Sequence, residues 1–176
     1  MTNKAIRTLV LAALFAALAC VATMVIQIPS PMNGYVNLGD CFVLLAGWVL
    51  GPVYGSLAAG IGSALADMFT GYMHYAPGTF LIKGGVALIA CLLLRMFYKK
   101  GQEPSILRLV CCTVPAEVFM ALGYFVYKAT VLGAGIGAAA GIPADLMQGL
   151  MGVIISVVLF RLLYRVSALR ERFWKG

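Results

Sequence analysis

Charged residues are scarce in this chain. Of its 176 residues only 11% are charged, whereas 62% are hydrophobic, and a typical soluble domain has about 25% charged and about 45–50% apolar residues. A soluble fold of this length needs a polar surface. The composition therefore excludes a soluble fold and predicts a surface that faces lipid. Because a membrane-crossing helix needs about 20 apolar residues, the chain has room for about five to seven crossings and no separate soluble domain.

Signatures of catalysis and metal binding are also absent. The sequence has no GxxxxGK[ST] phosphate loop, no HExxH motif and no GxSxG motif, so it lacks the usual phosphate-binding, zinc-protease and hydrolase sites. It has one histidine, and its five cysteines show no CxxC spacing, which indicates small core residues rather than metal ligands. We therefore expect no enzyme activity, no catalytic residue, no cofactor and no metal site.

Long apolar segments fill most of the sequence. The first expected helix covers about Ala5–Gln27 and stops before Pro29, which cannot continue a helix. Gly51-Pro52 interrupts the next apolar stretch, so we expect two short helices there, 39–50 and 53–71. Three further helices are expected at 78–98, 106–132 and 143–164. The prediction is an all-α integral membrane protein with one domain, 1–176, of six transmembrane helices.

Basic residues gather on one side of this six-helix plan. Most of the 13 Lys and Arg residues lie before the first helix, between the fourth and fifth, or at the C-terminal end: Lys4, Arg7, Arg95, Lys99, Lys100, Arg108, Arg161, Arg165, Arg170, Arg172 and Lys175. Cytoplasmic loops carry an excess of Lys and Arg. We therefore expect both termini in the cytoplasm, which requires an even number of crossings.

A few polar residues remain inside or beside the expected helices. Ionisable groups in a membrane are costly and are candidates for function, and on the six-helix plan they gather toward the outer half of the bundle. Such a mixture of charged and aromatic groups is typical of a pocket for a small polar aromatic ligand. The predicted substrate-binding residues are Asn37, Asp40, Tyr75, Lys83, Glu117, Tyr124, Asp145 and Gln148.

A structural interpretation of the same residues stays open. Asp40 and Asp67 could cap helix ends or pair with Lys83, and Glu117 could form an ion pair with Lys83 or Lys128. The tyrosines could be an interfacial belt, which is common at the membrane surface.

Small residues mark one face of the first helix. Ala12 and Ala16 are four residues apart, as are Ala13 and Ala17, and such pairs let another helix approach closely. The four alanines therefore predict either a docking surface for a partner or close packing within the bundle.

Several blocks of sequence resemble a known family. The segments GYVNLGD at 34–40, LGPVYG at 50–55, GSALAD at 62–67 and YAPGTFLIKG at 75–84 are similar to substrate-binding (S) subunits of energy-coupling factor (ECF) vitamin transporters, in the riboflavin-type branch. The matching core covers about residues 34–90.

The resemblance implies a function and partners. An S subunit of the bacterial cell membrane captures a vitamin from outside and docks through the alanines of its first helix onto a T subunit, which two ATPases drive. Riboflavin, the pyridoxine group and hydroxymethylpyrimidine are the candidate ligands, and no nucleic acid is expected. The alternatives are a small membrane enzyme or assembly factor with a polar intramembrane site, and a standalone channel or secondary transporter. The absence of repeated halves argues against the last of these.

Overall fold

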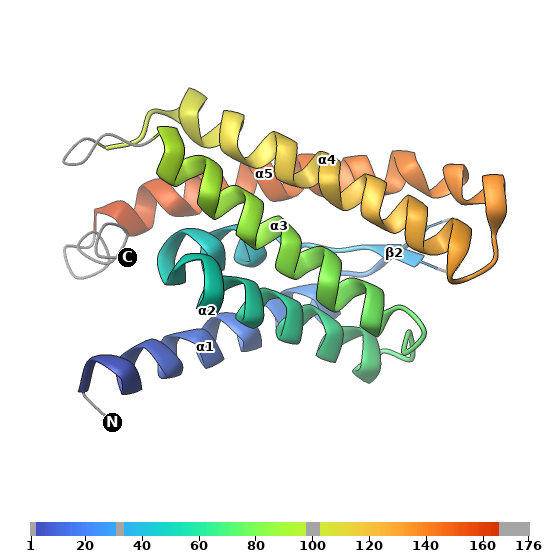
Figure 1. The fold of residues 1–176 in the computed structure, drawn as a ribbon, viewed down its shortest axis with the longest axis horizontal. Helices are drawn as coiled ribbons and strands as arrows, with labels where there is room; N and C mark the ends of the chain where they lie inside the picture. Colours follow the sequence, from blue (N-terminus) through green and yellow to red (C-terminus); the bar gives the residue numbers. More distant parts are fainter. Residues whose placement is uncertain (1–2, 31–33, 98–102, 166–176) are drawn as a thin grey trace.

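The computed structural model describes residues 3–30, 34–97 and 103–165. The chain folds into an elongated bundle of helices (Figure 1). The helices are α1 (Asn3–Val25), α2 (Asp40–Phe69), α3 (Ala76–Phe97), α4 (Ile106–Thr130) and α5 (Ile142–Tyr164), with a 3-10 helix η1 (Gly135–Gly141) before α5. Within these ranges, five helical segments are long and apolar enough to cross a membrane. The predicted all-α membrane fold is confirmed at this level.

The predicted break in the second apolar stretch is present within α2. Gly51 has φ 84° and ψ −176°, so it leaves the helical conformation, and Pro52 follows it. Glycine adopts this backbone conformation without the penalty that a Cβ would bring. A Cβ at Gly55 would lie 2.7 Å from the Cα of Gly47, so the segments before and after Gly51 pack against each other. The first segment is almost entirely buried.

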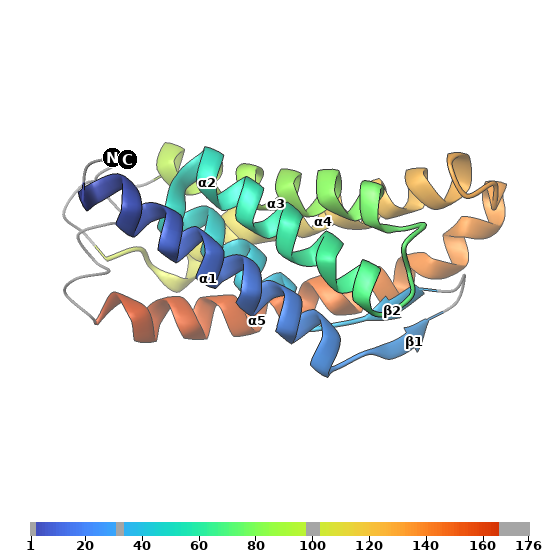
Figure 2. The same ribbon diagram turned by 90° about the horizontal axis from the view of Figure 1, so that it is seen from below.

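Two short elements were not predicted. Strands β1 (Ile28–Ser30) and β2 (Gly34–Val36) pair antiparallel, with Ile28 opposite Val36. They form a small hairpin after α1, beside α5 (Figure 2). The glycine- and alanine-rich segment before α5, for which no helix was predicted, forms η1. The helix boundaries differ from the predicted ones by a few residues; for example, α1 ends at Val25 rather than Gln27.

Close contacts at small residues hold the helices together. A Cβ at Gly47 would collide with the backbone oxygen of Ala87 on α3, and a Cβ at Gly62 would collide with the backbone oxygen of Ala16 on α1. Backbone approach at small residues is a main source of helix association in lipid, where no hydrophobic force drives helices together.

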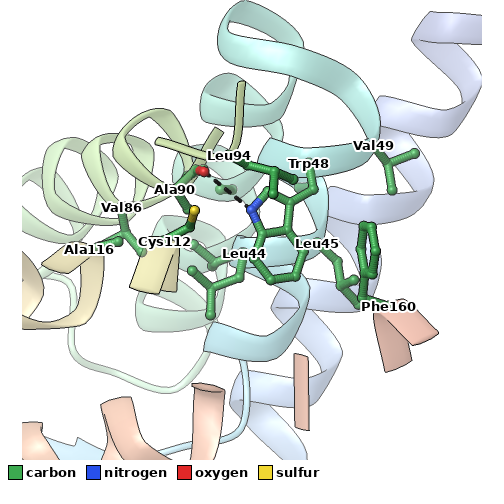
Figure 3. Close-up of a cluster of buried hydrophobic side chains, with 14 of the residues drawn as sticks. Leu44, Leu45, Trp48, Val49, Val86, Ala90, Leu94, Cys112, Ala116 and Phe160 are labelled. Atoms are coloured by element: carbon green, nitrogen blue, oxygen red, sulfur yellow. Dashed lines mark hydrogen bonds between the residues drawn. The ribbon is translucent and has the colours of Figure 1, made fainter. Parts of the chain in front are cut away.

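A compact apolar cluster fills the interior around the first segment of α2. Trp48 donates a hydrogen bond from Nε1 to the backbone oxygen of Ala90 at 3.2 Å, and its ring meets Phe160 edge to face at 5.2 Å (Figure 3). Leu44, Leu45 and other residues around them are fully or almost fully buried. We call this cluster, centred on Trp48 and Phe160, the apolar core.

The first turns of α1 and the last turns of α5 lie at the same end of the bundle (Figures 1 and 2). The C-terminal end of α3 and the start of α4 lie there too. These four helix ends carry Arg7, Arg95, Arg108, Arg161 and Arg165. The other predicted basic positions lie outside the residues or side chains that the structure describes: Lys4, Lys99, Lys100, Arg170, Arg172 and Lys175.

Candidate functional site

A polar cavity lies between the helices at the opposite end from the apolar core. It forms where α3 and α5 begin and where α4 ends, and α1, β2 and α2 also contribute to its wall. Its enclosed volume is about 30 Å³, which is room for about two water molecules. Pockets that hold whole small molecules usually measure about 300–1,000 Å³, so a vitamin-sized ligand requires the surrounding elements to move apart.

Most of the predicted binding residues meet at this cavity. Six of the eight line it: Asn37, Tyr75, Lys83, Tyr124, Asp145 and Gln148. Asp40 and Glu117 are buried nearby and do not line it. Six further residues line the cavity that were not among the predicted binding residues: Thr23, Tyr35, Ser63, Asp67, Thr79 and Lys128.

A buried hydrogen-bond network supports one wall of the cavity. The side-chain oxygen of Gln148 accepts hydrogen bonds from the Asn37 backbone N–H at 3.0 Å and from Asn37 Nδ2 at 3.1 Å. Gln148 Nε2 donates to Asp40 Oδ2 at 2.7 Å, and Lys83 forms an ion pair with the other oxygen of Asp40. This network joins the segment before α2 to α2, α3 and α5. The structural interpretation of Asp40, pairing with Lys83, therefore holds.

A second ion pair lies on the other side of the cavity. Lys128 Nζ is 2.8 Å from Asp145 Oδ2. The Tyr124 ring lies 5.5 Å from Lys83 Nζ and 5.6 Å from Lys128 Nζ, measured to the ring centroid. Both ammonium groups are thus within cation–π range of one aromatic ring. The Tyr124 hydroxyl is 3.1 Å from the Thr79 hydroxyl, which fixes the ring at the cavity wall.

Glu117 lies in the middle of α4 and does not line the cavity. It is 5% exposed, and neither carboxyl oxygen has a hydrogen-bond partner among the described residues. The carboxyl group lies against Gly149 and Gly152 of α5. The alternative ion pairs with Lys83 and Lys128 do not form, because these lysines pair with Asp40 and Asp145.

Aromatic side chains cover the outer side of the cavity. The rings of Tyr35 and Tyr72 are 4.7 Å apart, and those of His74 and Tyr75 are 4.8 Å apart. Tyr75 also lies 6.5 Å from the Tyr124 ring. Tyr75 is buried, whereas His74 is exposed, which places Tyr75 in the wall and His74 outside it.

The tyrosines beside the cavity are neutral phenols. Burial, followed by the nearby charge of Asp145, raises the pKa of Tyr75 to about 12. Burial and the adjacent Asp67 raise the pKa of Tyr35 above its ordinary value. Tyr35 donates its hydroxyl proton to Asp67 Oδ1 at 2.5 Å. The hydroxyl groups therefore act as hydrogen-bond donors at physiological pH.

The four alanines of α1 divide between two faces. Ala12 and Ala16 are half-buried against the bundle, and the backbone of Ala16 meets Gly62 of α2. Ala13 and Ala17 are exposed, as are the neighbouring Val10, Leu14 and Val21. Only the second pair is thus available to a partner helix.

Known proteins are similar to this chain in sequence and in fold. Residues 3–165 match the family described as ECF-type riboflavin transporter, S component. The chain is 37% identical over 116 residues to an uncharacterized protein from the gap 3′ region of Pyrococcus woesei, and the match covers 65% of this chain and 74% of that protein.

Two solved structures resemble the bundle. One, described as the S component of a bacterial ECF transporter, has a TM-score of 0.71 and 22% identity and covers 92% of this chain and 97% of its own. The other, an S component for biotin from an ECF-type ABC transporter, has a TM-score of 0.59 and 17% identity, with 98% and 99% covered. At these identities the likeness concerns the fold.

Proposed function

Since the chain belongs to the family of S components of ECF-type riboflavin transporters, we propose that it is the substrate-binding subunit of such a transporter, with a B-type vitamin or vitamin precursor as ligand. Proteins of this family are multi-pass membrane proteins that take part in transport and are not enzymes. The enzyme alternative raised by the polar intramembrane groups therefore does not apply to this chain.

The observation that carries the proposal is the polar cavity inside an otherwise apolar bundle. Two lysines, two carboxylates and several hydroxyl and amide groups face it. Burying such groups within a membrane costs free energy, so their presence indicates a functional site. Aromatic rings beside polar groups suit a small heteroaromatic ligand. Riboflavin is the first candidate because of the family, and the pyridoxine group and hydroxymethylpyrimidine are the others.

The energy for uptake comes from other chains in this proposal. The sequence has no phosphate loop, so a T subunit and a pair of ATPases drive transport. The proposed docking surface is the exposed face of α1 with Ala13 and Ala17, where small side chains permit close approach of a partner helix. Ala12 and Ala16 support this surface from within, through their packing on α2.

The proposed orientation places both termini in the cytoplasm and counts the two segments of α2 separately, giving six helices. Cysteine labelling in intact cells tests it, on a background without native cysteines. Met73→Cys, in an exposed position between α2 and α3, should react with an impermeant reagent from outside. Glu103→Cys, exposed before α4, should react only after the membrane is opened. The reverse pattern would contradict the orientation.

Identification of a bound small molecule tests the proposed function. The protein is purified from cells supplied with riboflavin, pyridoxine and hydroxymethylpyrimidine, and the molecule released on denaturation is identified by mass spectrometry. We expect one of these vitamins or precursors in near-stoichiometric amount. Purified protein that carries none of them, and binds none when they are added back, would contradict the proposal.

A further inference from the structure

Two polar atoms in the cavity wall have no hydrogen-bond partner among the described residues. They are Ser63 Oγ and Asp67 Oδ2. Their residues are 2% and 4% exposed, and both line the cavity. Because they are four residues apart on α2, their side chains lie on the same helix face. Buried polar groups in proteins almost always have a partner, and each one left without costs free energy.

The charges around the cavity distinguish Asp67 from Asp145, the other carboxylate that lines it. Asp145 is paired with Lys128, and the second cavity lysine, Lys83, is paired with Asp40. Within the described part of the chain, Asp67 forms no ion pair and accepts a hydrogen bond from Tyr35 through Oδ1. Its second oxygen is thus an acceptor at the cavity wall that makes neither a hydrogen bond nor an ion pair with the described residues.

The neighbouring hydroxyl groups are already engaged. The hydroxyl of Thr79 is 3.1 Å from that of Tyr124, and Tyr35 is bonded to the other oxygen of Asp67. Ser63 differs in this respect from the other α2 serine, because Ser56 donates to the backbone oxygen of Pro52 at 2.5 Å within its own helix. Ser63 Oγ and Asp67 Oδ2 are therefore a hydroxyl and a carboxylate oxygen on one face of α2 that make no hydrogen bond with the described residues.

We propose that Ser63 and Asp67 are the part of the binding site that recognises a hydrogen-bond donor of the ligand. An N–H or O–H group of the ligand donates to Asp67 Oδ2, and Ser63 Oγ bonds to the adjacent polar atom. Hydrogen bonds to an ionised carboxylate are about twice as strong as those between neutral groups. The ligand is therefore one with an amino, imide or hydroxyl group at this end. This inference rests on the proposed function and adds two binding residues to it.

Two sources of donor fit the same chemistry, and they are distinguishable. The donor is either a hydroxyl of a sugar-alcohol side chain, as in riboflavin, or an N–H group of a heteroaromatic ring. Lumiflavin has the flavin ring system of riboflavin without the hydroxylated chain. If a substitution at Asp67 weakens the binding of riboflavin but not that of lumiflavin, the donor is a hydroxyl of the sugar-alcohol side chain. A change that weakens the binding of both riboflavin and lumiflavin identifies the N–H group of the flavin ring as the donor.

Isothermal titration of purified variants tests the proposal. The probes are riboflavin, lumiflavin, pyridoxine and hydroxymethylpyrimidine. In Asp67→Asn the side-chain oxygen still accepts from Tyr35, while an NH2 group replaces Oδ2 and opposes a ligand donor. We expect about a tenfold or larger loss of affinity for the probe that the wild-type protein binds. Ser63→Ala should lower the affinity for this probe about threefold or more. The matched control Ser56→Ala should change the affinity less than about twofold.

The outcomes separate this inference from the proposed function. If the wild-type protein binds a probe and Asp67→Asn and Ser63→Ala bind it within about twofold of wild type, the inference is wrong and the proposed function stands. If the folded wild-type protein binds none of the probes, both are contradicted. Size-exclusion profiles and unfolding temperatures like those of the wild-type protein show that a loss of binding is not a loss of folding.

Discussion

The two ends of the bundle use the same helices for different kinds of packing. Around the apolar core, α2, α3 and α5 meet through the apolar side chains of Trp48, Ala90 and Phe160. Around the cavity the same helices contribute Asp67, Lys83 and Asp145, and tyrosines come from β2, from the residue before α3 and from α4. Each of α3 and α5 thus contributes polar residues to the cavity near its start and apolar residues to the core further along, and α4 has the reverse order.

The comparison indicates a division between stability and binding. The close contact of Gly47 with Ala87 and the large apolar rings of Trp48 and Phe160 determine the helix positions around the apolar core. At the other end, ionisable groups are held by networks that leave a few polar atoms unsatisfied. The network of Asp40, Lys83 and Gln148 lies between the two regions, because its members are buried and two of them also line the cavity.

The largest expected effect concerns this shared network. Lys83→Met leaves Asp40 as a buried charge without its cation, and breaking a buried pair in this way costs about 3–5 kcal/mol. We expect a matching fall in the free energy of unfolding, measured by denaturation in detergent, together with loss of ligand binding. The double variant Asp40→Asn/Lys83→Met should recover much of the stability and little of the binding. Stability unchanged in Lys83→Met would show that the pair has no structural role.

A substitution at the apolar core should affect stability alone. The Cβ of Gly47→Ala collides with the backbone of Ala87, and overpacking of this kind costs about 1–3 kcal/mol. Gly137→Ala is the matched control, since a Cβ there meets no atom within 4 Å. We expect a lower unfolding free energy for Gly47→Ala only, with an unchanged ligand Kd in the folded protein. A weaker Kd in Gly47→Ala would break the division between the two ends.

Carboxyl groups inside and outside the cavity wall should differ in their effect on affinity. Asp145 lines the cavity and Glu117 does not. Asp145→Asn keeps an oxygen that can accept from Lys128 and removes the charge, so we expect about a tenfold weaker Kd by calorimetry. Glu117→Gln should change the Kd by less than about threefold. Equal losses would place Glu117 in contact with ligand after all.

Substitutions on the two alanine faces of α1 should have different effects on vitamin uptake and folding. Ala17→Trp places a large ring on the exposed face, and we expect vitamin uptake by the complete transporter to fall several-fold while the isolated subunit binds ligand normally. Ala16→Trp lies beside Gly62 of α2 and should instead reduce the yield of folded protein. Normal uptake by Ala17→Trp would exclude this face as the docking surface.

Much of the fold could be predicted because the pattern of apolar residues determines helix positions directly. The break at Gly51-Pro52 was predicted from residue type, and the structure places a non-helical backbone there. The hairpin of β1 and β2 was missed because three-residue strands carry no alternating pattern. The 3-10 helix η1 was missed because its glycine–alanine composition is equally typical of a loop.

The site was harder to predict because a sequence gives the depth of a residue in a helix better than its direction. Asp145 and Gln148 were predicted to bind substrate, and both line the cavity. Glu117 was predicted to bind substrate as well, yet its side chain lies against the glycines of α5 and does not line the cavity. Ser63 was missed because a single serine in an apolar helix gives no signal, and only packing shows that its hydroxyl faces a cavity.

The central claim is that binding belongs to the polar end of the bundle. Stabilisation by ligand measures it directly: at a riboflavin concentration of about 100 times Kd, a bound ligand raises the unfolding free energy by about 2.7 kcal/mol. We predict this increase for the wild-type protein and for Gly47→Ala, despite the lower starting stability of the variant. For Asp145→Asn at the same concentration the increase should fall to about 1.4 kcal/mol. The same increase in Asp145→Asn as in the wild type, or its loss in Gly47→Ala, would contradict the account.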